Sequence, residues 1–182
     1  MNIVLGVTGS ISAYKAADIA NRLTKDGHDV HVVLTEGGAK FITPLTLQTL
    51  TKNRVCMDAF AEDDPSVVQH IDLAEKADIV LIAPATGNII GKIAAGIADD
   101  LLSAVVMAAA NQAPIYIAPA MNTNMYLNPV VQENIEKLRS LGYHFIDPRE
   151  AMLACGTMGT GALADVDEIV EKIEVVGGVE GL

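Results

Sequence analysis

The hydrophobic positions of this chain gather in short apolar runs that alternate with longer amphipathic segments. The clearest run is Asp78–Ala83, which is too short and too rich in β-branched residues for a helix. Such a run predicts a buried strand of a parallel sheet. Comparable runs predict strands at Asn2–Val7, Asp29–Leu34 and Pro114–Ala118, and a short strand at Tyr143–Ile146.

Helices are expected between these strands. The predicted helices are Ala13–Lys25, Ala39–Leu50 (with Pro44 in its first turn or interrupting it), Gln69–Lys76, one from about Ile89, one opening at Asp99–Ser103, Pro129–Leu141 and Val166–Val175. Segments 51–68 and 147–164 are expected to be irregular. This alternation, without a repeat or linker, predicts one α/β domain over residues 1–176, a doubly wound, Rossmann-like parallel sheet with helices on both faces. Residues 177–182 are expected to form a loose tail.

Composition adds an expectation about assembly. The chain has 182 residues, of which 51% are apolar and none is Trp, so the core must consist of Ile, Val, Leu, Ala and Met. The stretch Leu101–Ala110 is apolar all round, which is typical of a deeply buried helix or of a helix at a subunit interface. In a single small domain the interface is the favoured interpretation, and a homo-oligomer is expected.

Charge and cysteine content exclude several classes. The net charge of −11 argues against nucleic acid and anionic membrane surfaces, because both require a basic patch. Asp99, Asp100 and Asn111 interrupt the longest apolar stretches, so no membrane span is predicted. The N-terminus lacks the basic region and cleavage site of a signal peptide. Cys56 and Cys155 make no disulfide framework, and a cytoplasmic setting is expected.

The loop after the first strand is a candidate phosphate site, because open α/β folds bind ligands at the carboxyl ends of their strands. Gly9, Ser10 and Ser12 precede a helix, whose free N–H groups bind anions. A dinucleotide fingerprint would need a third glycine, and Thr35 rather than an acidic residue ends the second strand. The loop therefore favours a mononucleotide over a nicotinamide dinucleotide, and fits a serine cap without a ligand about equally well.

Two more loops are expected at the same edge. Pro84–Asn88 carries a hydroxyl, a carboxamide and a permissive glycine, which also suits an ordinary helix cap. Pro119–Met125 carries Asn122, whose carboxamide could donate to a substrate carboxylate, and methionines that could pack on an aromatic ring or fill the core. The glycine-rich surroundings of Ala154–Gly156 suit a mobile flap, although a lone cysteine is usually a small buried hydrophobe.

One histidine, His70, stands at the start of the helix before the central strand. His28, His31 and His144 follow a helix stop or lie within strands, and are interpreted as structural or surface residues. Taken alone, His70 has the same interpretation. Its place leaves open whether it reaches the ligand loops within one subunit or from a neighbouring subunit.

Together these stretches resemble the homo-oligomeric flavin-containing cysteine decarboxylases, and most of all the branch that serves coenzyme A biosynthesis. The resemblance runs from about Asn2 to Glu174. The family pattern has a GSIS-like turn at 9–12, a histidine at position 70, a PASANT-type loop at 84–89, a PxMNxxM loop at 119–125 and an ACG flap at 154–156. The PASANT-type loop departs from the pattern, because Thr86, Gly87 and Ile89 replace serine, alanine and threonine, while Asn88 is kept.

The resemblance implies FMN bound between the subunits of a homotrimer, or of trimers assembled into a dodecamer, and no metal. The implied cofactor-binding residues are Gly9, Ser10, Ser12, Thr35, Thr86, Gly87, Asn88, Ser103 and Ala120. The resemblance also implies His70 as the acid–base residue, Asn122 as the holder of the carboxylate, and Met125 and Ala154 in the substrate pocket. Cys155 would give the proton in the final reduction.

The implied reaction is decarboxylation of 4'-phosphopantothenoylcysteine to 4'-phosphopantetheine. FMN would oxidise the carbon that bears sulfur to a thioaldehyde, which accepts electrons as CO2 leaves, and the enethiol would then be reduced again. Two alternatives are a peptidyl-cysteine decarboxylase of lantibiotic maturation, which stops at the enethiol, and a non-catalytic flavoprotein regulatory module. Cys155 favours the coenzyme A enzyme, because the lantibiotic enzyme needs no reducing cysteine.

Overall fold

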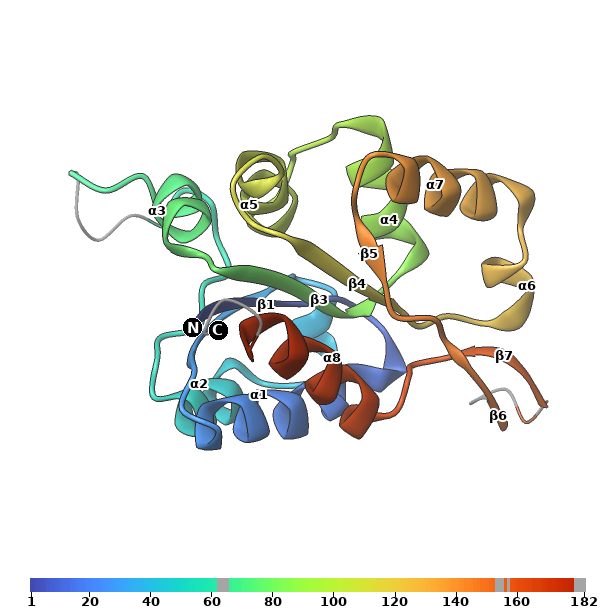
Figure 1. Cartoon of the computed structure of the whole chain (residues 1–182), viewed down its shortest axis with the longest axis horizontal. Coiled ribbons are helices and arrows are strands. Elements are labelled where there is room, and N and C mark those ends of the chain that lie inside the picture. The colour runs from blue at the N-terminus through green and yellow to red at the C-terminus, as the bar shows by residue number, and fades with distance from the viewer. Residues whose placement is uncertain (62–65, 153–155, 157, 179–182) are drawn as a thin grey trace.

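A computed structural model describes residues 1–61, 66–152, 156 and 158–178. Its main sheet has five parallel strands in the order β2-β1-β3-β4-β5 (Figure 1). The strands are β1 (Asn2–Val7), β2 (Asp29–Leu34), β3 (Ile79–Ala85), β4 (Ile115–Pro119) and β5 (His144–Phe145). The predicted doubly wound parallel sheet is therefore confirmed.

Helices cover both faces of this sheet (Figure 1). On one face lie α1 (Ala16–Lys25), α2 (Pro44–Thr51) and α8 (Val166–Gly178); on the other lie α3 (Gln69–Lys76), α4 (Gly87–Ala95), α5 (Leu101–Ala109) and α7 (Pro129–Ser140). The shorter elements are the 3-10 turns η1 (Ile11–Lys15) and η2 (Gly38–Lys40), the helix α6 (Thr123–Tyr126), and the antiparallel hairpin β6 (Arg149–Met152) and β7 (Met158–Ala162).

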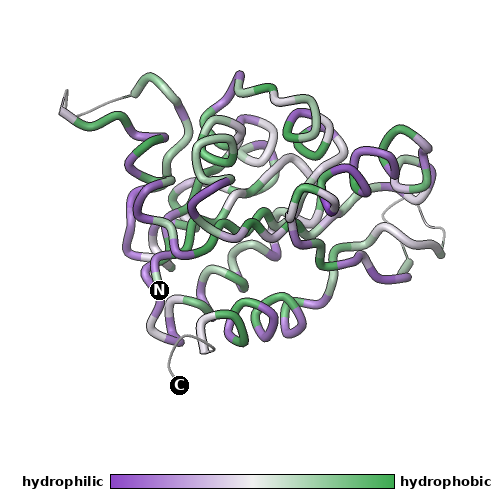
Figure 2. Tube along the Cα trace, turned by 45° about the horizontal axis from the view of Figure 1, so that its top comes forward, coloured by the Kyte–Doolittle hydropathy of each residue, from purple (hydrophilic) through white to green (hydrophobic). Residues whose placement is uncertain are grey.

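The sheet separates two apolar clusters, because successive side chains along each strand point to opposite faces. In β1, Ile3 and Leu5 pack into the cluster on the α1 and α8 side, whereas Val4 packs into the cluster on the α5 side. Figure 2 shows the hydrophobic residues concentrated in the sheet between the two helical layers. Both faces of the sheet are thus buried, which explains why its strands are continuous apolar runs.

Several expected boundaries differ from the structure, among them the end of β3 and the starts of two helices. β3 continues through Pro84 to Ala85, because Ala85 pairs with Pro119 of β4 after a local irregularity in the ladder. The helix expected at Ala39–Leu50 starts only at Pro44, because Thr43 caps it and accepts a hydrogen bond from the Thr46 backbone N–H. The start of the first helix is a 3-10 turn, η1.

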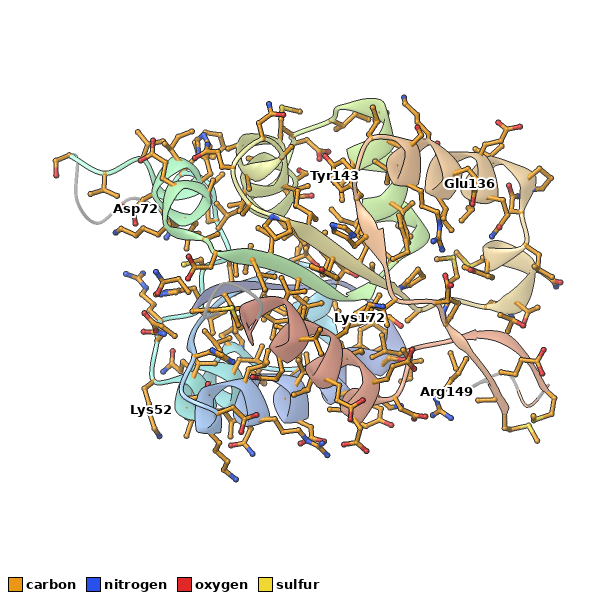
Figure 3. All side chains as sticks on the ribbon, in the orientation of Figure 1. Lys52, Asp72, Glu136, Tyr143, Arg149 and Lys172 are labelled. Atoms are coloured by element: carbon orange, nitrogen blue, oxygen red, sulfur yellow. The ribbon has the colours of Figure 1, made fainter. Side chains whose placement is uncertain are left out.

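The expectation of irregular structure at 147–164 is wrong for part of that segment. Arg149–Met152 and Met158–Ala162 pair as a hairpin. The first strand has only four residues and the second contains two glycines, so neither shows a strand pattern. The Met121 N–H donates to the Gly161 carbonyl at 2.9 Å, so the hairpin is fastened to the loop after β4. Arg149, labelled in Figure 3, donates to the Leu163 carbonyl and pairs with Asp165 at 3.2 Å.

Burial within the single chain explains most of the apolar composition of helix α5. Six of its nine residues are buried in the single chain: Leu101, Leu102, Ser103, Val105, Val106 and Ala109. Met107 is an exception, with 49% of its surface exposed. The helix is therefore a core element first, and its composition is weak support for an oligomer. Among the described residues, the helices are too short or too polar to cross a bilayer.

Candidate functional site

A cavity lies at the carboxyl edge of the sheet, the end toward which the strand arrows point in Figure 1. Its volume is about 640 Å³, within the usual range for a small-molecule site. The loops after β1, β2, β3 and β4 all contribute to its wall, together with parts of α4, α6 and the α4–α5 connection. The lining residues are Thr8, Gly9, Thr35, Glu36, Gly37, Thr86, Gly87, Asn88, Ile89, Lys92, Asp99, Asp100, Ala120, Met121 and Met125.

The loops after β1 and β2 meet at two glycines. A Cβ atom on Gly9 would lie 2.9 Å from the carbonyl carbon of Gly37 and 3.0 Å from its Cα, so a side chain at position 9 would displace backbone. Ser10 caps η1 and accepts a hydrogen bond from the Ser12 N–H at 3.3 Å. Gly9 lines the cavity, whereas Ser10 and Ser12 continue the loop just beyond its wall.

The loop after β3 becomes the start of α4. The Thr86 hydroxyl accepts a hydrogen bond from the Ile89 N–H at 3.3 Å and caps the helix, so Thr86, Gly87 and Asn88 are held at the cavity by the first turn. Asn88 is exposed. The expected meeting of this loop with the Pro119–Met125 loop is confirmed, since both contribute to one cavity.

One wall of the cavity is charged. The Lys92 ammonium lies 2.7 Å from a carboxylate oxygen of Asp99 and 2.7 Å from one of Asp100. Hydrogen bonds to Asp100 and Asp99 raise the pKa of Lys92. Burial alone would raise the pKa of Asp100, but Lys92 and the hydrogen bonds from Ser103 outweigh it and leave that pKa below its ordinary value. With Glu36 also present, this side of the cavity disfavours an anionic ligand group.

The loop after β4 supplies a carboxamide and a thioether. Asn122 caps α6, where its side-chain oxygen accepts a hydrogen bond from the Asn124 N–H at 2.8 Å. Met125 lines the cavity with 54% of its surface exposed, and buried Ala120 forms part of the wall. Asn122 therefore stands at the rim, next to Met121, which does line the cavity.

Two predicted cofactor residues have structural hydrogen bonds. The Ser103 hydroxyl donates to the Asp100 carbonyl and accepts from the Asp100 N–H, which completes a capping box, and Ser103 borders a separate small hollow between α4 and α5. The Thr35 hydroxyl donates to the Val7 carbonyl at 3.2 Å and accepts from the Gly38 N–H at 3.1 Å, although Thr35 does line the cavity.

His70 lies away from this cavity in the described chain. It follows Gln69 at the start of α3, and its Nδ1 atom is buried without a hydrogen-bond partner among the described residues. The Gln69 amide contacts the Cys56 sulfur at 3.3 Å, and burial raises the pKa of that thiol. Two other predicted residues, Ala154 and Cys155, fall outside the described residues.

Several lining residues were not singled out from the sequence. Thr8, Glu36, Gly37, Lys92 and Met121 all line the cavity. The position of Thr8 directly after a strand was a usable signal, as was the spacing of Lys92 four residues after Asn88 on one helix face. Glu36 and Gly37 follow the second strand in the same way.

Comparison with known proteins gives a consistent result. The Flavoprotein family model matches residues 1–176. A probable phosphopantothenoylcysteine decarboxylase of Streptococcus mutans is 50% identical over 94% of this chain and 96% of its own length. The coenzyme A biosynthesis bifunctional protein CoaBC of Bacillus subtilis is 47% identical over 95% of this chain, which spans only 42% of that protein.

Solved structures agree with the sequence matches. A PPC decarboxylase variant complexed with pantothenoylaminoethenethiol superposes with a TM-score of 0.87 at 30% identity, over 97% of both chains. The FMN-dependent cysteine decarboxylase SpaF gives a TM-score of 0.84 at 30% identity, over 97% of this chain and 96% of its own. The chain therefore belongs to the Flavoprotein family, and its cofactor is a flavin.

Proposed function

We propose that this chain decarboxylates 4'-phosphopantothenoylcysteine to 4'-phosphopantetheine in coenzyme A biosynthesis, with FMN as its flavin. The observation that carries the proposal is the 50% identity to a probable phosphopantothenoylcysteine decarboxylase over nearly the full length of both chains. The cavity at the sheet edge, lined by the loops that the family pattern predicts, supports it independently.

The residues around the cavity fit a flavin mononucleotide. Because Gly9 and Gly37 lie backbone to backbone, this part of the cavity wall carries no side chains. It suits a ligand that packs directly against the main chain. Thr86 and Asn88 offer polar groups, while Ile89, Ala120 and Met121 offer an apolar wall for a ring. The phosphate is proposed to lie near Gly9, Ser10 and Ser12, at the start of η1, because free N–H groups at such a start suit an anion.

When bound, FMN supplies reversible acceptance of a hydride, which a side chain does not provide. The chain's own residues bind and orient the substrate. Asn122, at the rim beside the cavity, is proposed to donate from its amide to the substrate carboxylate, and Met125 to pack against the substrate's apolar part. Cys155 is proposed to give a proton in the reducing step that restores the saturated thiol.

His70 is proposed to be the acid–base residue, which exchanges a proton with the substrate during oxidation and loss of CO2. Its Nδ1 atom is buried without a partner among the described residues, which leaves that nitrogen available to exchange a proton. Because His70 does not line the cavity of its own chain, the complete site is proposed to form between subunits of a homo-oligomer, a trimer or a dodecamer built from trimers.

A one-pot assay tests this function. The FMN-loaded protein would be incubated with phosphopantothenoylcysteine and with a peptide that ends in cysteine, and mass spectrometry would follow loss of CO2. The expected products are saturated phosphopantetheine and an untouched peptide. His70→Asn should lower the rate about 10²–10⁴-fold while keeping the flavin. The control variant His31→Asn, at a half-buried position of the edge strand β2, should match the unmodified protein.

The other outcomes are equally definite. An unsaturated peptide product would assign the chain to peptidyl-cysteine decarboxylation, as in lantibiotic maturation. No reaction with either substrate, with flavin bound, would make it a non-catalytic flavoprotein module. Cys155→Ser should release CO2 and yet stop at the enethiol, and full reduction by that variant would refute the role of Cys155.

A further inference from the structure

One hydroxyl group joins two of the loops that enclose the cavity. Thr8 follows β1 directly and is only 2% exposed. Its hydroxyl donates to the Pro84 carbonyl at 2.6 Å and accepts a hydrogen bond from the Thr86 N–H at 3.0 Å. The Thr8 N–H donates to the same Pro84 carbonyl at 3.3 Å. Thr8 therefore contacts both the carboxyl end of β3, at Pro84, and the first residue after that strand, Thr86.

We propose that Thr8 is a positioning residue. It sets the spacing between the loop after β1 and residues Pro84–Thr86, where β3 passes into α4, so that these two segments can enclose the flavin. The inference rests on the proposed use of a flavin at this cavity. It does not depend on which cysteine-containing substrate the protein decarboxylates.

The hydrogen bonds continue beyond Thr8 into the cavity wall. Thr86, held by Thr8 through its N–H, uses its own hydroxyl to cap α4 at the Ile89 N–H. On the other side of Thr8 comes Gly9, whose backbone lies against Gly37. A shift in the Thr8 hydroxyl would therefore move the start of α4 relative to the Gly9 floor, and both line the cavity.

A main-chain hydrogen bond also joins Thr8 to Pro84, but the bond from the Thr86 N–H depends on the Thr8 hydroxyl. The main-chain bond from Thr8 to Pro84 would survive loss of the hydroxyl, but the Thr86 N–H would lose the acceptor that the structure gives it. A buried donor without a partner is costly, so the turn would reorient until water or another group satisfied it. The expected consequence is a change in the shape of the site more than in the core.

The chain offers a matched control for this hydroxyl. Thr51 is 4% exposed, and its hydroxyl donates to the Leu47 carbonyl at 3.1 Å and accepts from the Asn53 N–H at 3.3 Å. It thus makes the same kind of buried bridge at the end of α2, away from the cavity lining. Thr8→Val and Thr51→Val remove equivalent hydroxyls with little change in volume.

The test measures FMN affinity of the apo-protein by quenching of flavin fluorescence, with thermal unfolding of each apo-protein alongside. Thr8→Val is expected to weaken FMN binding at least tenfold and to change the visible circular dichroism of the bound flavin. Thr8→Ser, which keeps both hydrogen bonds, and Thr51→Val should bind within about threefold of the unmodified protein, since threefold is below 1 kcal/mol.

The contrary outcomes are distinct. FMN affinity of Thr8→Val within threefold of the unmodified protein, or an equal loss in Thr51→Val, would overturn the proposal. If Thr8→Val does not fold, Thr8→Cys replaces the hydroxyl by a weak donor and acceptor and should show the same loss. Failure of both to fold would make Thr8 a residue of the core, and the proposal would be wrong. Failure of the unmodified protein to bind FMN would instead refute the proposed function.

Discussion

Gly9 and Gly37 bring two loop backbones together at the floor of the cavity, and we predict that Gly9→Ala weakens FMN binding at least tenfold. The added methyl group would lie 2.9 Å from a backbone atom of Gly37, and backbone does not move aside as a flexible side chain does. Fluorescence titration of the apo-protein measures the loss. Gly91→Ala is the control, because its Cβ would meet only the Asn134 amide at 3.9 Å.

The Lys92 ion pairs predict a pH dependence of stability. The pKa of Asp100 is lowered in the folded protein, so its contribution is fully present above its unfolded pKa of about 3.9 and is lost as the pH falls through the folded value. Lys92→Gln should therefore lower the free energy of unfolding of the apo-protein by roughly 1 kcal/mol at pH 7, and the difference should narrow below pH 4. Urea unfolding at both pH values checks this.

The control for Lys92 is an ion pair in an exposed setting. Lys76 contacts Asp72 one helical turn away at 2.7 Å, and 66% of the Lys76 side chain is exposed. Lys76→Gln should change the free energy of unfolding by only a few tenths of a kcal/mol. A Lys92→Gln deficit that stayed constant from pH 7 to pH 3 would show that lost packing, not charge, explains it.

At the scale of the elements, the β6–β7 hairpin depends on Gly161. This residue has φ +138°, and a Cβ there would collide with the Met121 carbonyl. Gly161→Ala should therefore release the hairpin from the loop after β4, and limited proteolysis should cut within residues 149–162 faster than in the unmodified protein. The substitution adds volume where two backbones touch.

Gly142→Ala is the control, because it introduces backbone strain at a positive φ without the steric collision expected at position 161. Gly142 has φ +92°, yet nothing lies within 4 Å of its Cβ position. Its substitution should cost about 1 kcal/mol of stability without new cleavage in the hairpin. Equal cleavage in both variants would mean that the hairpin is not fastened through position 161.

At the scale of the whole molecule, a site shared between subunits predicts complementation. At limiting FMN, His70→Asn and Gly9→Ala should each be strongly impaired alone, since one lacks the proton carrier and the other binds the flavin weakly. Co-expressed in equal amounts and mixed at random, they should regain decarboxylation at about a quarter of all sites, where an intact cavity meets an intact His70 from a neighbour. Hybrids as inactive as the parent variants would place His70 and the cavity in the same subunit.

The elements could be predicted from the sequence because their signals are local. A run such as Ile79–Ala83, buried on both sides, indicates a parallel strand wherever it occurs, and the positions of the loops follow from strand polarity. The hairpin at 149–162 could not be predicted, since neither of its strands shows a clear apolar alternation and its bond to Met121 joins it to a loop far away in the sequence. For helix α5 the sequence left two interpretations open, because an apolar helix looks alike in a core and at an interface. The structure shows that six of its nine residues are buried within the chain, and the oligomer stays a prediction.

The sequence by itself determined the fold class, three of the loops of the site and the family pattern, since each depends on residues close together in the chain. Only the tertiary structure decided which side chains line the cavity. It turned the Ser103 hydroxyl toward a helix cap, set His70 outside the cavity of its own chain, and brought Thr8 to Pro84 and Thr86. Residues 76 positions apart meet through the register of β1 against β3, which no local pattern encodes.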